Sequence, residues 1–290
     1  KWYAPSMGFY SDGSLFDFTT PIHLLQFRPL SLIERLRMGV ATMYLQRIRN
    51  HTQFEDIRAS TYLPKLTGRR AFEKIWRPLL MAKFGEQWDE ISMAWFWGRV
   101  HVRFQSRSRF GLREELGYLD GSFASISGAL ARKVEDLGGR ILVGRPVESL
   151  LREGLRVTGL RAGGEERSYD HVIGTVGLPI LRRLLGPGLL SDELGSIDYR
   201  AALVMLLQLD RAAGHHYWTN IGDRRLPFAG LIEHTNFVSP DRYGGAHLLY
   251  VSNYVKSDDY LFTLSDDDLF DKYAPHITQV LPEFCPGTVV

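Results

Sequence analysis

Residues 138–150 read GGRILVGRPVESL, and this stretch decides how the middle of the chain folds. The pair Gly138-Gly139 ends a helical pattern, because glycine readily adopts the backbone conformation that closes a helix. The apolar residues that follow predict a strand at 140–144, and a polar break separates it from a second strand at 146–151. A helix that leads directly into closely spaced strands predicts a domain containing both kinds of structure.

The sequence on either side extends this pattern. Before the glycines, apolar residues recur at helical spacing: Phe123, Ile126, Leu130, Val134 and Leu137. After residue 151, the sequence predicts strands at 155–161, 166–169 and 171–175 and a short helix through Leu185. Turns fall at Glu153-Gly154 and Gly163-Gly164, as antiparallel hairpins require. The middle of the chain therefore predicts a block of β-hairpins.

The flanking sequence predicts helices first and a mixed sheet later. Ser31 and Glu34 have the spacing of a capping box at a helix start. Predicted helices cover 31–50, 55–66, 69–82 and 90–105, with Pro78 interrupting the third. Predicted strands cover 201–209, 216–219, 228–234 and 247–254, and a final helix follows Ser265 with the buried stripe Leu269, Tyr273, Ile277 and Val280. The fold class is α+β.

Composition excludes several classes of protein. The 290 residues carry 35 basic and 33 acidic side chains. The net charge is therefore too small to favour binding to nucleic acid. The single cysteine, Cys285, cannot form a disulfide within the chain, which suits a reducing compartment. Charged residues or glycines interrupt every apolar run before it reaches the length of a membrane span. We expect a cytoplasmic protein.

Motifs of autonomous hydrolytic or metal chemistry are missing. The sequence has no G-x-G-x-x-G or P-loop pattern, no G-x-S-x-G turn, no H-E-x-x-H and no Cys/His set with zinc spacing. His215 and His216 are adjacent, and on a strand their rings would point to opposite faces. The sequence therefore predicts no metal site.

A set of short motifs runs in a characteristic order along the chain. In the middle are LGYLDGSF (116–123), the Gly-Gly helix stop, RPVE (145–148), the hairpin through Gly159 and DHVIGT (170–175). Upstream are WRPLL (76–80), KFG (83–85) and SMAW (92–95), and downstream are YW (217–218) and PF (227–228). This order resembles the flavin-containing amine oxidoreductase superfamily, close to its protoporphyrinogen oxidase-like and carotenoid desaturase-like members. The resemblance covers nearly the whole chain.

The resemblance implies an FAD-binding domain assembled from separated pieces of chain. By this comparison, residues 1–116 form the helical part of a substrate domain, 117–185 the middle segment of the FAD domain, and 186–290 the mixed-sheet part of the substrate domain. The glycine-rich phosphate loop is then expected before Lys1, and a closing flavin segment after Val290. We therefore expect the chain alone to bind FAD weakly or not at all, and to be inactive.

The resemblance also implies two cofactor contacts. Val147 matches the position whose backbone meets the adenine of FAD, and Thr175 is expected near the cofactor at a strand end. The resemblance assigns no catalytic residue. Many amine oxidases of this superfamily have a lysine near the flavin at the strand that here begins with Tyr199-Arg200-Ala201, and no lysine stands there. This departure favours an apolar polycyclic or polyene substrate over a simple amine.

Two further residues are candidates for substrate contact. Trp95 belongs to a Trp-Phe-Trp run whose side chains point to different sides of a helix, so core packing is the stronger interpretation and a substrate pocket the alternative. Arg103 belongs to a stripe with Arg99 and Arg107 that could receive acidic substrate groups such as propionates, although most such stripes are solvated.

Together these observations predict part of an FAD-dependent oxidoreductase that oxidises C–N or C–C bonds of a small apolar or amphipathic substrate. The alternatives are a flavin-dependent nucleotide-sugar mutase and a non-catalytic module that binds an apolar ligand or partner. The basic helix at 31–50, with Ile33, Leu36, Val40, Met43 and Tyr44 on one face, is interpreted as a packed helix with one wet side. Peripheral contact with an anionic membrane is the alternative.

Overall fold

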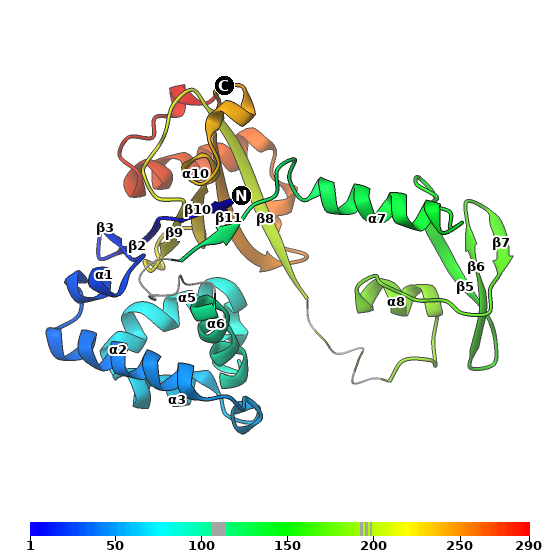
Figure 1. Ribbon diagram of the computed structural model, residues 1–290, viewed down its shortest axis with the longest axis horizontal. Coiled ribbons are helices and arrows are strands. Elements are labelled where there is room, and N and C mark those ends of the chain that lie inside the picture. The colour runs from blue at the N-terminus through cyan, green and yellow to red at the C-terminus, as the bar shows by residue number, and fades with distance from the viewer. Residues whose placement is uncertain (106–113, 192–193, 195–196, 198) are drawn as a thin grey trace. The chain divides into compact units, whose positions relative to one another are not determined.

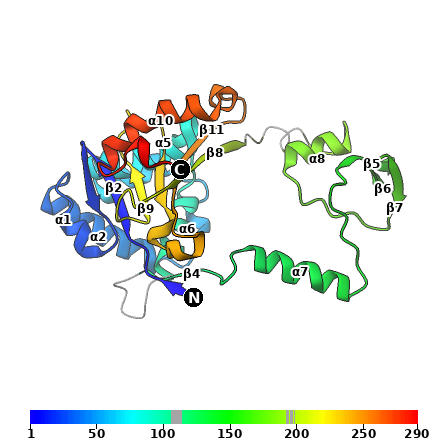
Figure 2. The ribbon, with the colours of Figure 1, turned by 90° about the horizontal axis from the view of Figure 1, so that it is seen from above.

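The structure is a computed structural model that describes residues 1–290 except 106–113, 192–193, 195–196 and 198. Contacts divide the chain into two compact units (Figures 1 and 2). Unit 1 consists of Lys1–Tyr118 and Arg200–Val290, and unit 2 of Leu119–Tyr199. Unit 1 is thus built from the two ends of the sequence, with unit 2 inserted between them.

A six-stranded sheet forms the centre of unit 1, in the order β3-β2-β9-β10-β11-β8. Neighbouring strands are antiparallel except β2 and β9, which are parallel and come from opposite ends of the chain. The strands are β2 (Met7–Ser11), β3 (Ser14–Asp17), β8 (Arg200–Leu209), β9 (Trp218–Ile221), β10 (Gly230–Glu233) and β11 (His247–Lys256). A separate two-stranded pair joins β1 (Trp2–Tyr3) to β4 (Leu116–Gly117). The mixed sheet predicted for the last third of the chain is confirmed.

One helix, α10 (Asp266–Val280), supplies most of the packing on one face of this sheet (Figure 1). The hydroxyl of Ser265 accepts a hydrogen bond from the Asp268 amide at 3.1 Å and so caps the helix. The predicted stripe of Leu269, Tyr273, Ile277 and Val280 is buried. It packs in one apolar cluster with the side chains that the sheet directs toward the helix, namely Leu207, Leu231, Leu249 and Val251.

The remaining helices of unit 1 contribute to two further apolar clusters. They are α1 (Pro21–Gln26), α2 (Leu32–Arg47), α3 (Ala59–Thr67), α4 (Arg69–Ala71), α5 (Arg77–Phe84) and α6 (Met93–Gln105). A π-helical turn, Phe72–Trp76, separates α4 from α5, and Pro78 is the second residue of α5. A helix accommodates proline most easily in its first turn. Here α5 continues through Pro78, and the irregularity near it is the π-helical turn directly before α5. Short 3₁₀ turns cover Thr52–Phe54, Gly85–Asp89, His234–Asn236, Pro240–Tyr243, Tyr260–Thr263 and Pro286–Thr288.

The orientation of α2 differs from the prediction. The capping box is confirmed, since Ser31 N donates to the Glu34 carboxylate at 2.8 Å and Glu34 N donates to the Ser31 hydroxyl at 3.4 Å. The buried residues of α2, however, are Met38, Ala41 and Leu45, which lie on another side of the helix than the predicted face. The predicted apolar face of Ile33, Leu36, Val40, Met43 and Tyr44 is exposed, from 46% at Tyr44 to 78% at Ile33. Its interpretation as the packed side of the helix is therefore wrong.

Unit 2 contains α7 (Ala124–Asp136), a three-stranded antiparallel sheet and α8 (Leu178–Leu185). The strands are β5 (Val147–Glu153), β6 (Arg156–Ala162) and β7 (Glu165–Ser168). Their turns contain Gly154, Gly163 and Gly164, all with positive φ between 60° and 76°. Such a backbone conformation is accessible to glycine without a steric penalty, so the predicted hairpins form where the glycines stand.

Two predicted strands of unit 2 are not formed. Residues 140–144 and 171–175 pair with no other strand. Each segment contains an apolar residue, Val143 or Ile173, that is more than 80% exposed. A strand requires a neighbour that satisfies its amides and carbonyls, and the described residues of unit 2 provide none for these segments. The apolar stripe of α7 is also exposed, from 42% at Val134 to 75% at Leu137. The composition of these segments predicts burial, but only a partner surface can provide it.

Candidate functional site

The two predicted cofactor residues lie in unit 2. Val147 opens β5, which is the edge strand of the hairpin sheet, and it pairs with Ala162 on one side only. Thr175 lies in the exposed segment before α8 and does not end a strand, contrary to its predicted position. Among the described residues of unit 2, no hydrogen bond links Val147 to Thr175. The structure therefore places both residues at the surface of unit 2.

Val147 offers an extended backbone with one unpaired edge, because β5 is an edge strand of the three-stranded sheet. The contact that the family resemblance implies for an adenine requires such a backbone rather than a particular side chain. Next to Val147, Glu148 accepts a hydrogen bond from the Gly164 amide at 2.9 Å, which ties the strand to the hairpin turn. A pyrophosphate, in contrast, requires several converging amides at a helix start, and the sequence contains no glycine-rich loop of that kind.

Trp95 is a packing residue of the helical cluster. Its ring meets Phe84 edge to face at 4.8 Å and is only partly buried. The neighbouring residues point elsewhere: Phe96 is buried against Trp76, and the indole of Trp97 donates to the carbonyls of Leu45 and Ile48. The prediction that the three aromatic side chains diverge is confirmed. Trp95 and Trp97 are both partly buried.

The predicted basic stripe continues from Trp95 along α6. The guanidinium of Arg99 lies 5.6 Å from the centre of the Trp95 ring, close enough for a cation–π interaction. Arg103 is exposed one turn later, and Arg107 lies outside the described residues. Helix α6 thus brings Trp95 and Arg99 together and carries Arg103 along the same side.

The sheet of unit 1 has an apolar row on the face opposite α10, which we call the outer row. Trp218, Ile232, Tyr250 and Leu206 lie directly opposite one another on β9, β10, β11 and β8. Residues in register share a face of the sheet. The row is partly accessible, and Leu206 is 52% exposed. Sequence alternation along each strand could have shown two faces, but only the register shows that these four residues align.

Aromatic side chains border the outer row near β10. Tyr217 stacks on Phe237 with ring centres 4.6 Å apart, and Tyr3 contacts the same ring at 5.2 Å. His234 lies 5.5 Å from Tyr243 and 6.2 Å from Tyr250 of the outer row, and its Nε2 is 2.7 Å from the Tyr243 hydroxyl. The outer row and its border combine apolar and aromatic side chains with a few polar groups at one end, a composition that binding sites for apolar ligands share.

A cavity of about 530 Å³ lies elsewhere in unit 1, between α5 and the end of β9. Its lining combines Met81, Trp88 and Phe228 with the charged residues Glu86, Asp223 and Arg224. Neither Trp95 nor Arg103 lines it. Because its walls carry charges of both signs, this cavity suits an apolar molecule less well than the outer row does.

A buried carboxyl group lies at the end of β10. Glu233 is 2% exposed, and its Oε1 accepts a hydrogen bond from the Ala213 amide at 3.0 Å. Its Oε2 has no partner among the described residues. Burial raises the pKa of Glu233 to about 7, against the opposing effect of the hydrogen bond from Ala213. Sequence analysis could not identify this group, because an isolated glutamate is usually solvated.

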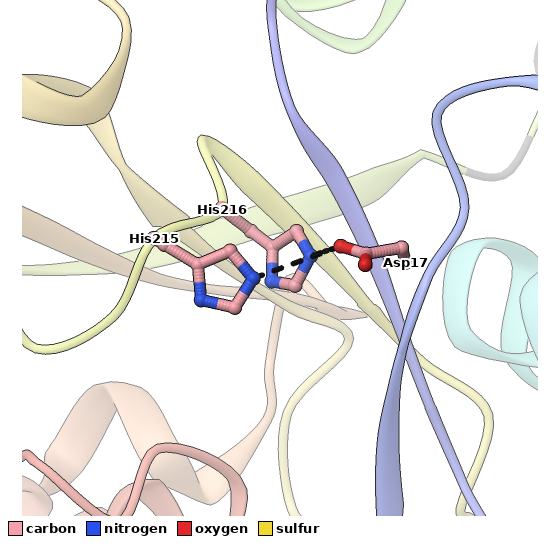
Figure 3. A group of neighbouring side chains, drawn as sticks. All are labelled: Asp17, His215 and His216. Carbon is pink, nitrogen blue, oxygen red and sulfur yellow. Dashed lines mark hydrogen bonds and ion pairs between the residues drawn. The ribbon is translucent and has the colours of Figure 1, made fainter. Parts of the chain in front are cut away.

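The arrangement of the adjacent histidines differs from the prediction. His215 and His216 lie in the segment that joins β8 to β9, not on a strand, so the alternation of strand side chains does not apply. Their ring centres are 3.9 Å apart, and both rings face the carboxylate of Asp17 at the end of β3 (Figure 3). The expectation that the two rings point to opposite faces is wrong.

Solved structures share this fold at low sequence identity. An oxidoreductase from Methanosarcina mazei superimposes with a TM-score of 0.70 at 17% identity, over 97% of this chain and 67% of its own. A protein from Exiguobacterium sp. 255-15, described as a candidate protoporphyrinogen oxidase, gives 0.71 at 16% identity, over 100% of this chain and 68% of its own. A reduced UDP-galactopyranose mutase gives 0.68 at 13%, over 100% and 65%. The chain therefore spans about two thirds of the length of these proteins and shares their α+β fold.

The sequence itself identifies the family. None of the curated proteins matches the chain. The sequence profile of the family described as flavin containing amine oxidoreductase, however, matches residues 11–290, which include nearly all of both units. The members of this family are flavoproteins, in agreement with the order of motifs along the sequence. The chain belongs to the flavin-containing amine oxidoreductase family.

Proposed function

We propose that the chain is part of an FAD-dependent oxidoreductase that oxidises C–N or C–C bonds of a small apolar or amphipathic substrate, as a protoporphyrinogen oxidase or a carotenoid desaturase does. The observation that carries this proposal is the family match over residues 11–290 together with the outer row of unit 1. Bound FAD supplies the hydride acceptor in such reactions. The residues of this chain would hold the substrate, orient it and exclude water.

The outer row supports an extended apolar substrate. Its side chains cross four strands, so a planar or elongated molecule could contact several of them at once. We propose Trp95 and Arg103 as further substrate contacts, the first apolar and the second for acidic groups. Arg200 lies at the start of the strand where many amine oxidases of the superfamily have a lysine, and it donates to the Phe84 carbonyl at 2.7 Å. Its guanidinium is therefore committed to the end of α5, which is consistent with a substrate other than a simple amine.

The 290-residue chain alone is expected to bind FAD only weakly. Two or three missing hydrogen bonds to the pyrophosphate, at about 1.5–3 kcal/mol each, correspond to an affinity lower by at least roughly 100-fold than that of a complete site. Titration of FAD, followed by flavin fluorescence, measures this. Tight, stoichiometric flavin in the purified chain would contradict the expectation.

Purification of a longer protein from the same reading frame tests whether the parent protein is an enzyme or a binding module. If flanking sequence supplies the phosphate loop, the purified protein should be yellow and should be bleached by an apolar substrate that it oxidises. A folded but colourless protein would support the non-catalytic module instead. Turnover of a nucleotide sugar without net oxidation would support the mutase, whose likeness to this chain is one of fold.

The exposed face of α2 favours peripheral contact with a membrane, which we propose as a second property of unit 1. Ile33, Leu36 and Val40 are each more than 50% exposed and lie along one side of the helix. Arg35 and Arg37 bond backbone carbonyls, whereas Arg28 and Arg47 are exposed and could meet anionic lipid. None of the described helices has the length and apolar character that crossing a bilayer requires.

Vesicle flotation tests this contact. The chain is expected to float with vesicles that contain phosphatidylserine, and replacing Ile33 and Val40 together by Glu should lower the bound fraction about tenfold or more, because two apolar side chains can no longer enter the bilayer. Phe262→Glu, at a residue of similar exposure in the 3₁₀ turn Tyr260–Thr263, is the matched control. The membrane role would be excluded if the unaltered chain, the double variant and Phe262→Glu floated equally. It would also be excluded if the unaltered chain did not float with the vesicles.

A further inference from the structure

Three potential metal ligands meet beside the sheet of unit 1. Oδ1 of Asp17 lies 2.7 Å from Nε2 of His216 and 3.6 Å from Nε2 of His215. One ligand atom from each residue lies within 4.8 Å of the other two (Figure 3). We propose that Asp17, His215 and His216 bind a divalent transition-metal ion such as Zn²⁺. Such a site is independent of FAD and of the proposed oxidation.

The ligand set matches the chemistry of these metals. Two imidazoles and one carboxylate form open three-residue sites for Zn²⁺ and for Fe²⁺, with the remaining position left to water. Neighbouring ligands of a tetrahedral ion are about 3.3–3.5 Å apart, given metal–ligand distances near 2.1 Å. The Asp17–His216 distance must therefore lengthen by several tenths of an ångström. The side chains of Asp17 and His215 are 56% and 74% exposed, so both can move and the ion has an entry path.

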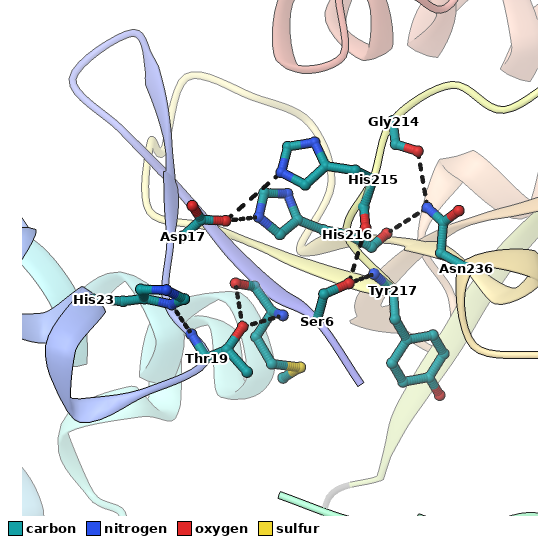
Figure 4. Close-up of polar contacts among 10 residues, drawn as sticks. Ser6, Asp17, Thr19, His23, Gly214, His215, His216, Tyr217 and Asn236 are labelled. Atoms are coloured by element: carbon teal, nitrogen blue, oxygen red, sulfur yellow. Dashed lines mark hydrogen bonds and ion pairs between the residues drawn. The ribbon is translucent and has the colours of Figure 1, made fainter. Parts of the chain in front are cut away.

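The backbone that carries the two histidines is held in place by hydrogen bonds (Figure 4). Ser6 donates to the His215 carbonyl at 2.9 Å and accepts from the Tyr217 amide at 2.9 Å. On the other side, the Asn236 amide donates to the carbonyls of Gly214 at 2.9 Å and His216 at 3.1 Å. A fixed backbone presents both rings to Asp17 before an ion arrives, which lowers the cost of binding.

Metal binding must displace the hydrogen bond inside the cluster. A carboxylate and a neutral imidazole are the forms that bind metals, so an incoming ion replaces the proton that Nε2 of His216 shares with Asp17.

Two neighbours define the limits of the site. Gly8 leaves room for the buried ring, since a Cβ at this position would lie 2.9 Å from Nδ1 of His216. His23 is near Asp17 in Figure 4, but its Nδ1 accepts a hydrogen bond from the Thr19 amide at 3.2 Å. The proton of a neutral His23 is then on Nε2, so this ring has no lone pair to offer and the ligand set stays at three.

Metal binding to the chelator-treated chain, free of any affinity tag, tests the proposal. Calorimetry with Zn²⁺ is expected to show one ion per chain, and Co²⁺ is expected to give the visible absorption of a site with nitrogen and oxygen ligands. His215→Ala and Asp17→Asn should each lower the Zn²⁺ affinity about 100-fold, since even the loss of an outer-shell partner costs 10–100-fold. His215 is exposed, so its replacement should leave the fold intact, as circular dichroism would verify.

His51→Ala is the matched control. His51 and Glu55 form an exposed histidine–carboxylate pair at 3.6 Å on the same unit, with two potential ligands instead of three. This variant should bind Zn²⁺ as the unaltered chain does. An ion at saturating concentration should also raise the melting temperature of the unaltered chain by roughly 5 °C, and that of the His215→Ala variant much less. Equal affinity in the unaltered chain, His215→Ala and His51→Ala, or no saturable binding at all, would overturn the proposal.

Discussion

Replacing Phe27 by alanine is expected to lower the free energy of unfolding of unit 1 by about 4 kcal/mol, within the range of 3–5 kcal/mol typical of buried phenylalanines. Phe27 is fully buried between α1 and α2. Its ring meets those of Phe9, Phe16 and Phe18 at centre distances of 5.7, 5.0 and 5.4 Å, each near the edge-to-face geometry that aromatic rings prefer. Alanine would leave a cavity that three rigid rings cannot fill.

Urea unfolding followed by tryptophan fluorescence measures this effect in unit 1 alone, because all six tryptophans lie in that unit. Phe262→Ala, at a phenylalanine that is 45% exposed, is the control and should cost less than about 1 kcal/mol. If both variants lost the same stability, the aromatic cluster around Phe27 would not be the packing centre that the structure describes.

The second large effect is expected at Glu233, where stability should depend on pH. The pKa of Glu233 is about 7 in the folded state, against an ordinary value of 4.5. Between pH 4.5 and pH 7, Glu233 is therefore protonated in the folded chain and ionised in the unfolded chain. The folded state then binds more protons, so the free energy of unfolding falls as the pH rises from about 4.5 to 7, by a total of about 3 kcal/mol. Glu233→Gln removes this loss and should be more stable than the unaltered chain at pH 8, by about 2–3 kcal/mol.

The measurement is the difference in unfolding free energy between Glu233→Gln and the unaltered chain at about pH 5 and pH 8. A difference is required because burial also lowers the pKa of His216 and His234, which titrate in the same range with the opposite sign. Glu90→Gln, at an exposed glutamate of unit 1, should show the pH dependence of the unaltered chain. A difference at Glu233 that stays constant with pH would show that this carboxyl is ionised throughout.

Local signals predicted much of the fold. The cap at Ser265 and the stripe of α10 depend on residues within a few positions of one another, and both are as the sequence predicts. The hairpins of unit 2 form because their turns contain glycines with positive φ. Periodicity also indicated that α2 and α7 are amphipathic. It could not indicate that their apolar faces are exposed, because burial of a face depends on surfaces far away in the sequence.

The candidate sites depend on pairings that no local pattern shows. His216 and Asp17 are 199 positions apart and meet only because β2 pairs with β9. The outer row likewise follows from the register of four strands. Val147 and Thr175 came from family resemblance, and their roles, like those of Trp95 and Arg103, stay predictions. The family, in contrast, could be inferred from the order of diffuse motifs, and the profile match confirms it.

The pairing of β2 with β9 has a consequence for synthesis on the ribosome. Tyr217, directly before β9, follows Ser6, its hydrogen-bond partner directly before β2, by 211 residues. At roughly 5–20 residues per second, β2 waits on the order of 10–40 s for β9 to be translated. All five residues of that strand are buried once it is paired. Until then the nascent chain exposes an apolar strand with an open edge, which makes it a client for chaperones that bind during translation.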